Sequence, residues 1–441
     1  MEKLDINRYF GKSFCCPYCH SRHEIPVKKL FTKTGAIFSL PDIISKLIVG
    51  KNILILCDNN TYKAAGEKCE KVLSKSFNAS CLILSSGKNK KIHAEEKYFP
   101  AILKKLKGKD AIITAGSGTI TDLGKYAADK MKIPVISVPT APSMNAYTSG
   151  VSAFISGTLK KTVPVKPAIA VVTDLDIISN APIEMIKAGF ADSLARSFAN
   201  ADWKLACLFT EEKFCALPYE ITENLEASYI DKARQIIKRD KRMILKMMKA
   251  LHLGGISMII AGSSSPASGG EHLISHYLDM VAHKNKKDSF SLHGLQVGLG
   301  VMISAATYER LNKLDLSDVR YLLKNHKSKE HLNAHEFIRK NFGIEEELNK
   351  KLLLLNTLRK KLPFLWNKLK KEVFPMAKGS EEIKDILKNA GCPLKFSEIG
   401  VDRDLAYQAI NYSRFIRPRL TVFDIAGELG ILTDIAYQFT Q

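Results

Sequence analysis

Between residues 53 and 138 the sequence alternates short apolar runs with helix-like segments, and this alternation limits the possible fold more than any other feature. The apolar runs cover residues 53–57, 81–84, 110–114 and 135–138, and the helix-like segments cover 61–76, 94–107 and 118–130. Parallel strands need long crossover connections, which are usually helices. The pattern therefore predicts an α/β domain with a parallel sheet. Two further strand-like runs, at 151–155 and 168–173, extend it.

Beyond Pro182 the apolar residues recur at helical spacing. This periodicity predicts helices over residues 182–210, 223–252, 254–261, 270–282, 291–310, 316–326 and 332–371. We expect an irregular segment at 1–35, an α/β domain over 36–180 and an all-α domain over 181–441. No chemistry is assigned to the Lys- and Leu-rich residues 311–375.

Composition is that of an ordinary globular protein, with 46% hydrophobic and 25% charged residues in a chain of 441. No run of about 18 uncharged apolar residues is present, so we expect no membrane span. The first residues lack the apolar core of a signal peptide, which predicts a cytoplasmic protein. Nine cysteines in such a chain indicate reduced thiols rather than a disulfide framework.

The net charge of +21 is compatible with nucleic acid, a membrane surface or an anionic small substrate as partner. The densest lysine stretch, residues 350–371, alternates with leucines at helical spacing. Such spacing is typical of solvated helix faces rather than of a nucleic-acid groove. We therefore expect a small substrate and no nucleic acid.

A glycine turn at residues 116–122 follows one of the predicted strands and opens a predicted helix. A helix N-terminus presents unpaired N–H groups and partial positive charge, which suits a diphosphate. The candidate cofactor-binding residues here are Gly116, Ser117, Gly118, Thr119 and Asp122. The alternative is a turn whose glycines are required only for steric reasons.

Two other loops follow predicted strands, where open α/β sheets bind ligands. Residues 138–149 are rich in hydroxyls and prolines and include Thr140 and Ser143, two further candidate cofactor contacts. The alternative is a rigid connecting turn. Asp58 ends the first strand, where it would either bind an adenosine ribose hydroxyl or cap the next helix.

Three candidate metal ligands are Asp192, His272 and His293. One carboxylate and two imidazoles, with positions left for substrate or water, suit a catalytic zinc or iron ion. His276 lies four residues after His272, so a helix places both on one face. That pair would either chelate the metal together or supply one ligand and one proton relay. A single helical histidine is more often a satisfied polar residue.

The segment Cys16-x-x-Cys19-His20 formally matches covalent haem attachment, which the absence of an export signal disfavours. Cys16, Cys19 and His23 would suit a small zinc site, but the sequence offers no second distant pair. We expect a disordered, reduced segment there.

Several motifs, in order along the chain, resemble the sn-glycerol-1-phosphate dehydrogenases. They are residues 139–143, 181–192, 201–205, 270–276, 292–294, 390–393 and 417–424. That family belongs to the superfamily of dehydroquinate synthase, glycerol dehydrogenase and iron-dependent alcohol dehydrogenases. The similarity runs from about residue 24 to the C-terminus.

The resemblance implies a dehydroquinate synthase-like fold whose active site lies in the cleft between an N-terminal nucleotide-binding domain and a helical metal- and substrate-binding domain. It implies Asp192, His272 and His293 as ligands of one divalent metal, with zinc favoured and iron or nickel as alternatives. It implies NAD or NADP on the glycine turn and dihydroxyacetone phosphate and sn-glycerol 1-phosphate as the substrate pair. A homo-oligomer is expected.

Catalytic and substrate roles complete the expectation. His276 is the predicted proton relay, because helix geometry makes it the nearest candidate to the metal ligands. Lys160 and Lys161, in the segment 156–166, are the predicted cationic partners of the substrate phosphate. Asn145 stands where the family usually carries Asp beside the substrate hydroxyls, so a charge is lost while hydrogen bonding is kept. That departure leaves open a sister dehydrogenase acting on another phosphorylated or acidic carbonyl compound. A dehydroquinate-synthase-like lyase and a non-catalytic nucleotide-binding protein are further alternatives.

Overall fold

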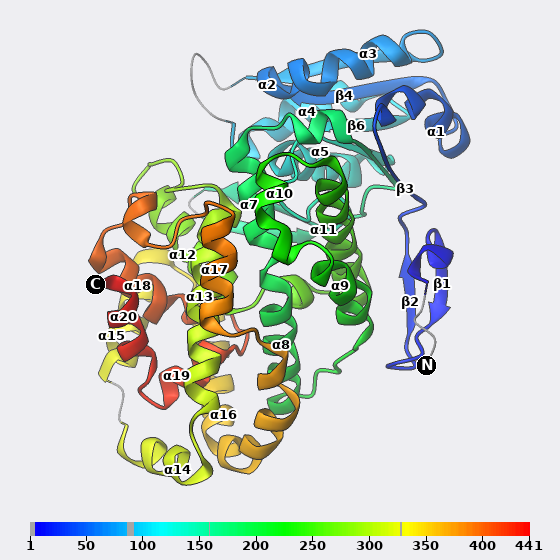
Figure 1. The fold of residues 1–441 in the computed structure, drawn as a ribbon. Helices are drawn as coiled ribbons and strands as arrows, with labels where there is room; N and C mark the ends of the chain where they lie inside the picture. The colour runs from blue at the N-terminus through cyan, green and yellow to red at the C-terminus, as the bar shows by residue number, and fades with distance from the viewer. Residues whose placement is uncertain (1–4, 86–91, 158, 327–328) are drawn as a thin grey trace. The chain divides into compact units, whose positions relative to one another are not determined.

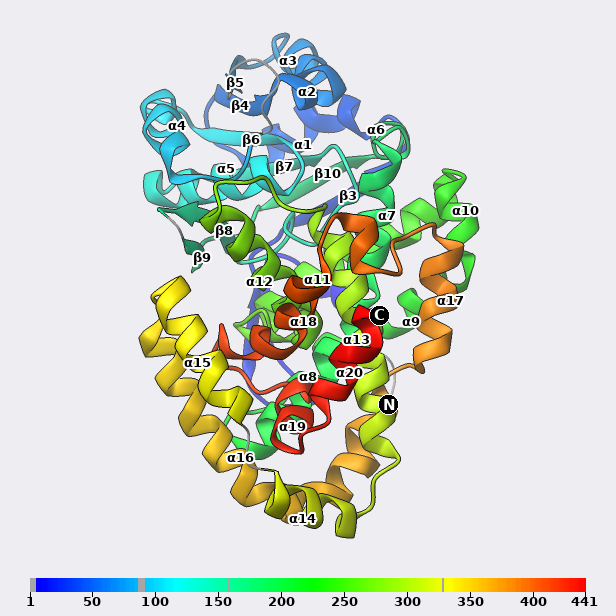
Figure 2. The same ribbon diagram turned by 90° about the vertical axis from the view of Figure 1, so that its left-hand side faces the viewer.

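The computed structural model describes residues 5–85, 92–157, 159–326 and 329–441. The chain divides into two compact units, Met1–Phe190 with Glu220–Gly262, and Ala191–Tyr219 with Ser263–Gln441. Each is described separately below, and Figures 1 and 2 label their elements.

The first unit is built on a six-stranded sheet in the order β3-β10-β7-β6-β4-β5. All five neighbouring pairs are parallel. The strands are β3 (Lys29–Lys33), β4 (Asn52–Asp58), β5 (Asn78–Leu84), β6 (Ala111–Gly116), β7 (Val135–Pro139) and β10 (Ala170–Asp174). The predicted parallel α/β sheet is thus confirmed.

Alternate residues of the central strands face two helical layers. Ile53 and Ile55 of β4 belong to a buried cluster with α1 (Leu40–Leu47) and α3 (Glu67–Leu73). On the other face, a Cβ placed on Gly124 of α5 (Gly118–Met131) would meet Thr114 and Leu56. The remaining crossover elements are α2 (Asn59–Thr61), η3 (Tyr62–Gly66), η4 (Glu96–Tyr98) and α4 (Phe99–Leu106). The central strands β4, β6, β7 and β10 are buried on both faces, as expected for parallel sheets.

Residues 1–35 were predicted to be irregular, and that prediction is wrong for the described part. β1 (Lys12–Cys15) and β2 (Arg22–Ile25) form an antiparallel hairpin, and β3 is an edge strand of the main sheet. The hairpin packs beside α11 (Lys241–Ala261), as Figure 1 also shows. Short strands with mainly exposed side chains carry little apolar alternation, which is why the pattern was missed.

Three helices beyond the predicted domain boundary at 180 also belong largely to the first unit. They are α9 (Leu217–Ala227), α10 (Ala233–Ile237) and α11. The helix predicted over 223–252 is interrupted, because Arg239 adopts a left-handed φ of 65° and Asp240 caps α11. A second hairpin, β8 (Val151–Ser156) and β9 (Leu159–Pro164), follows the main-sheet strand β7.

α11 is long and apolar enough to cross a membrane by length and composition. However, 67% of its most apolar window is buried inside the fold, as in the core helix of a globular protein. Within the described residues no other helix meets these two criteria.

The second unit is helical in the residues that the structure describes. Its longer helices are α8 (Ala195–Phe209), α12 (Gly270–Lys284), α13 (His293–Asn312), α14 (Leu316–Asn325), α15 (Lys329–Phe342), α16 (Glu345–Glu372), α17 (Ser380–Asn389), α18 (Arg403–Tyr412), α19 (Val422–Glu428) and α20 (Leu432–Thr440). α16 packs against both α14 and α15, as Figure 2 shows. Buried positions of α16, most of them leucines, recur every three or four residues, so its lysines mostly line solvated faces as predicted.

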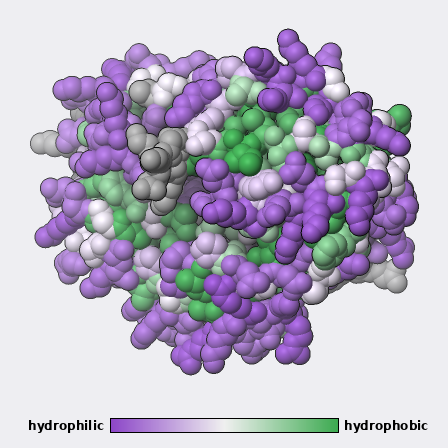
Figure 3. All heavy atoms as spheres, turned by 90° about the horizontal axis from the view of Figure 1, so that it is seen from above, coloured by the Kyte–Doolittle hydropathy of each residue, from purple (hydrophilic) through white to green (hydrophobic). Residues whose placement is uncertain are grey.

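Lys351 is the exception in this stretch. Its side chain is fully buried, and its Nζ lies 2.7 Å from Oδ2 of Asp424. Seen from above, hydrophilic side chains cover most of the visible face of the protein, and hydrophobic ones form smaller separate areas (Figure 3).

Candidate metal centre and nucleotide turn

Asp192, His272 and His293 converge in the second unit. Asp192 lies in the last turn of α7 (Ile183–Ser193), His272 in the first turn of α12 and His293 at the start of α13. One donor atom from each lies within 4.8 Å of the others. The Oδ1 of Asp192 is 3.3 Å from Nε2 of His272 and 4.0 Å from Nε2 of His293. Three side chains distant in sequence are therefore brought to one point.

Neighbouring polar groups fix the orientation of both imidazole rings. The Nδ1 of His272 lies 2.9 Å from Oε1 of the fully buried Glu271, which also accepts a hydrogen bond from the N–H of Gly269. The Nδ1 of His293 lies 2.9 Å from Oγ of Ser275. With Nδ1 engaged in each ring, Nε2 is the atom that faces Asp192. This is the arrangement by which outer groups orient histidines that ligate metals.

The charge balance at this point suits a divalent cation. Burial disfavours the charged form of Asp192, but the rings of His272 and His293 and the guanidinium of Arg196 lower its pKa overall. Burial likewise opposes protonation of His272, yet Asp192 and Glu271 raise its pKa to about 9. The buried carboxylates of Asp192 and Glu271 therefore favour a positive charge at this site.

The Oδ1 of Asp192 is buried and has no hydrogen-bond partner in adequate geometry among the described residues. Such an orphaned oxygen between two imidazole nitrogens is what a metal ion would satisfy. The residues present therefore fit the predicted metal, and their nitrogen and oxygen donors suit zinc or iron.

His276 borders this centre without joining the ligand group. Its ring stacks on that of His293, with centroids 5.7 Å apart and planes 15° from parallel. Its centroid is 6.1 Å from that of His272. The group of close donor atoms contains His272 and not His276, which favours one ligand and one relay over a chelating pair.

The predicted glycine turn lies in the first unit, between β6 and α5. Ser117 precedes the first residue of α5, Gly118, and makes no capping hydrogen bond with its side chain. The N–H groups of Gly118 and Thr119 therefore belong to the first turn of the helix, where no intrahelical acceptor exists. A Cβ at Gly116 would be 2.5 Å from Ile120, and one at Gly118 would be 1.8 Å from Sδ of Met144. The steric reason for these glycines is thus present, and cofactor binding here stays a prediction.

Two carboxylates predicted near the cofactor have structural partners. Asp58 caps α2 by accepting hydrogen bonds from the N–H groups of Asn60 and Thr61, so the capping alternative is confirmed. Asp122 is buried, and its Oδ1 lies 3.3 Å from Nζ of Lys125. Their contact with a cofactor remains a prediction.

The loop that follows β7 begins beside the glycine turn and is firmly packed. The N–H of Thr140 donates to the carbonyl of Gly116 at 3.2 Å. A Cβ at Gly189 of α7 would be 1.4 Å from the carbonyl oxygen of Pro142, so this helix touches the loop backbone. Ser143 and Asn145 are half-buried within the loop. The alternative of a rigid connecting turn is compatible with these contacts, and the roles of Thr140, Ser143 and Asn145 stay predictions.

The two lysines predicted to hold the substrate phosphate lie on β9. Lys161 is exposed, and its Nζ donates to Oγ of Ser156 at 3.0 Å. The side chain of Lys160 lies outside the described residues. Neither position adds support to the predicted role.

Sequence reasoning missed Arg196, which lies near the start of α8. Its side chain is 3% exposed, and its three guanidinium nitrogens have no hydrogen-bond partner among the described residues. Its charge is also among the causes that lower the pKa of Asp192. The available signal was a charged residue inside an otherwise uncharged helical run, residues 193–201.

Comparisons with known proteins agree with this architecture. The family model for iron-containing alcohol dehydrogenases matches residues 31–182. The chain is 35% identical over 294 residues to the glycerol-1-phosphate dehydrogenase (NAD(P)+) of Geobacillus thermodenitrificans, covering 66% of this chain and 72% of that protein. It is 29% identical to the protein of the same name from Bacillus subtilis, covering 92% of each.

Among solved structures, a probable glycerol dehydrogenase from Sinorhizobium meliloti matches with a TM-score of 0.61. That match covers 93% of this chain and 98% of the other at 14% identity, so it supports the fold alone. The predicted resemblance is confirmed by the sequence relatives. The chain therefore belongs to the glycerol-1-phosphate dehydrogenase family, among the iron-containing alcohol dehydrogenases.

Proposed function

We propose that this protein reduces dihydroxyacetone phosphate to sn-glycerol 1-phosphate with NADH or NADPH and catalyses the reverse oxidation. Relatives that bear the name glycerol-1-phosphate dehydrogenase (NAD(P)+) align over most of the chain. The observation that carries the proposal is the convergence of Asp192, His272 and His293, with the Nδ1 atoms of both histidines engaged by neighbouring groups.

Asp192, His272 and His293 would hold the metal. When bound, a divalent metal would polarise the ketone oxygen, and a reduced nicotinamide would supply the hydride. The contribution of the chain is to hold its three donors in place before substrate arrives. Glu271 and Ser275 fix the two rings, and burial of Asp192 keeps competing water away from its carboxylate.

We assign the proton transfer to His276. Reduction of a ketone adds a hydride and then a proton, so a titratable group is needed close to the reacting oxygen. His276 stacks on the ring of His293 and is not itself in the ligand group. A protonated imidazole is a general acid that can donate its proton to the alkoxide oxygen.

Arg196 is our candidate partner for the substrate phosphate. A buried guanidinium without hydrogen bonds is costly unless an anion satisfies it, and phosphate accepts two parallel N–H bonds from arginine. Arg196 is 3% exposed, its three nitrogens have no partner among the described residues, and its charge reaches Asp192. The phosphate of a bound substrate would therefore supply the negative charge that pairs with the Arg196 guanidinium.

The direct test follows NADH and NADPH absorbance with dihydroxyacetone phosphate in metal-replete buffer. We expect stoichiometric loss of reduced cofactor in the wild type and loss of both bound metal and turnover in Asp192→Asn and His293→Gln, with nucleotide binding retained. His283→Gln on the same helix α12 is the matched control and should keep both. Full activity of the Asp192 variant after chelation and dialysis would contradict the assignment. Turnover without net consumption of NADH would indicate the lyase alternative.

Asn145 favours a second candidate, a sister dehydrogenase for another phosphorylated or acidic carbonyl compound. The family resemblance places an Asp at this position, and a neutral amide there lowers the negative charge beside the substrate. A panel of aldehydes and ketones with phosphate or carboxylate groups separates the candidates by their kcat/KM values. Higher kcat/KM for any of them than for dihydroxyacetone phosphate would support the sister activity.

A further inference from the structure

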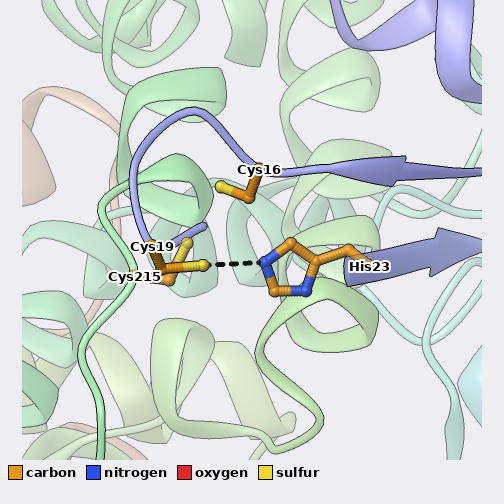
Figure 4. Close-up of side chains that lie close together, drawn as sticks. All are labelled: Cys16, Cys19, His23 and Cys215. Carbon is orange, nitrogen blue, oxygen red and sulfur yellow. Dashed lines mark hydrogen bonds between the residues drawn. The ribbon is translucent and has the colours of Figure 1, made fainter. Parts of the chain in front are cut away.

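The N-terminal hairpin carries cysteine and histidine side chains that could bind a metal and that are not part of the Asp192 group. Cys16 and Cys19 lie in the turn between β1 and β2, and His23 lies on β2. The Sγ of Cys19 is 3.2 Å from Nε2 of His23, as Figure 4 shows. Cys16 is fully buried, and Cys19 and His23 are partly buried. Side chains of this kind are uncommon in so small and exposed a hairpin.

The backbone of the turn explains why two cysteines separated by two residues face the same point. The N–H of Cys16 donates to the carbonyl of Ser21 at 2.9 Å, and the N–H of His20 donates to the carbonyl of Cys16 at 3.0 Å. His20 adopts a left-handed φ of 57°, which reverses the chain tightly. A knuckle of this kind is how Cys-x-x-Cys motifs present two thiolates to one ion.

The three donor atoms converge on one point. The Sγ atoms of Cys16 and Cys19 and a ring nitrogen of His23 all lie within 4.8 Å of one another (Figure 4). All three residues belong to the first unit.

We propose that Cys16, Cys19 and His23 bind a zinc ion that stabilises the hairpin. Thiolates and imidazole are the ligands of structural zinc sites, in which a Cys-x-x-Cys pair commonly supplies two of them. Soft thiolates also select zinc over the harder divalent ions.

The hairpin itself gives the reason for such an ion. Its strands have four residues each, and Phe14 and Ile25 are the buried side chains on them. A two-stranded hairpin with so little apolar burial is marginally stable in water. A metal bound at the turn ties the strands together and fixes the residues that lead into the edge strand β3.

Disulfide formation and covalent haem attachment, two other roles for these cysteines, fit the structure less well. None of the nine cysteines, all within the described residues, forms a disulfide. Haem attachment would use His20, whereas the histidine in the donor group is His23. The thiols are therefore arranged for a metal ion.

Cobalt substitution tests the proposal in the full-length protein, because thiolate-to-cobalt charge transfer reports sulfur ligands alone. The Asp192 centre contains no sulfur, so its occupancy does not contribute to that absorption. We expect the charge-transfer band in the wild type and in Asp192→Asn, and its loss in a Cys16→Ser/Cys19→Ser double variant. Cys15→Ser and His20→Gln are matched controls from the same hairpin and should retain it.

Zinc-dependent protection of the thiols gives a second measurement without any variant. In wild-type protein, Cys16 and Cys19 should react with an alkylating reagent much more slowly when zinc is bound than after chelation, as read by mass spectrometry. Equal labelling in both states, or an identical cobalt band in the double variant and Cys15→Ser, would overturn the proposal. Dehydrogenase activity is a separate readout, so either result leaves the proposed reaction intact.

Discussion

The candidate metal centre depends at the residue scale on groups that lie outside its ligand set. Ser275 is fully buried in α12, and its hydroxyl lies 2.9 Å from Nδ1 of His293. The hydroxyl fixes the rotation of an imidazole that begins a helix and is 23% exposed. Ser275 is therefore a positioning residue, and its effect should appear in metal affinity.

We predict that Ser275→Ala weakens metal binding about 10- to 100-fold, the usual cost of losing such a partner. Ser275→Thr, which restores a hydroxyl, should recover most of the affinity. Ser304→Ala on α13 is the control, because that buried hydroxyl has no hydrogen-bond partner among the described residues. Competition with a chelator measures all three. Equal affinities for the Ser275 and Ser304 alanine variants would show that the hydroxyl does not position the ring.

Arg196 offers a prediction that separates substrate binding from structure. Arg196→Met should lower kcat/KM for dihydroxyacetone phosphate by roughly 30-fold or more, because a buried charge pair is worth about 2 kcal/mol or more. Reduction of unphosphorylated dihydroxyacetone should change little. Since an unpaired buried cation is unfavourable, the variant should unfold at the same or a higher temperature. Equal losses on both substrates would argue for a structural role.

Among single residues, the sequence pointed to the three candidate metal ligands, which the structure brings together, and it did not point to Arg196. His272 stands in a recognisable motif with its neighbours, Gly270-Glu271-His272. A lone arginine has no such context, because its role depends on residues that folding brings close to it.

Elements around the loop that follows β7 are packed against it through glycines. Gly255 of α11 leaves room for Thr148 and for the carbonyl of Asn145, since a Cβ there would be 2.0 Å and 2.7 Å from them. Gly189 of α7 likewise leaves room for the carbonyl oxygen of Pro142. Helices α7 and α11 thereby set the position of the loop that we expect to meet cofactor and substrate.

We predict that Gly255→Ala displaces this loop, lowers kcat/KM and destabilises the protein by about 1–3 kcal/mol, the usual cost of overpacking. Gly150→Ala is the matched control in the same loop, because its nearest neighbour, Cγ1 of Ile259, would be 3.6 Å away. Steady-state kinetics and thermal unfolding compare the two variants. Equal changes in kcat/KM and in unfolding temperature for the two variants would contradict this role of Gly255.

Elements with strong periodicity were predicted well from the sequence, and weakly patterned ones were not. The buried central strands β4, β6 and β7 read as continuous apolar runs. The edge strand β3 is lysine-rich and half-buried, so it carries no comparable signal. The assignment of α11 to the first unit depends on tertiary packing against α6 (Leu175–Ser179) and β2, which periodicity does not encode.

Stability against acid is a property of the whole molecule to which His335 of α15 contributes. Burial and the positive charges of Arg414 and Arg339 lower its pKa to about 4. The unfolded chain binds this proton near pH 6.5 and the folded one only near pH 4. The contribution is therefore complete above about pH 6.5 and is lost as the pH falls towards 4.

We predict that His335→Gln flattens the fall in unfolding temperature between pH 7 and pH 4. The wild type and the variant should differ most in slope within that window and little in slope above it. His20→Gln, at an exposed site, is the control and should follow the wild-type profile. Parallel wild-type and His335→Gln profiles across the window would contradict the assignment.

The pairing of β3 with a strand far along the chain delays its incorporation into the sheet during synthesis. Among the described strands β3 pairs only with β10, and Lys29 lies opposite Ala170. At about 5–20 residues per second, a ribosome needs roughly 7 to 28 seconds to make the roughly 140 residues between them. During that interval β3, the first main-sheet strand to be synthesised, lacks its partner strand β10. The lysines of β3 disfavour its pairing with other exposed strands before β10 is made.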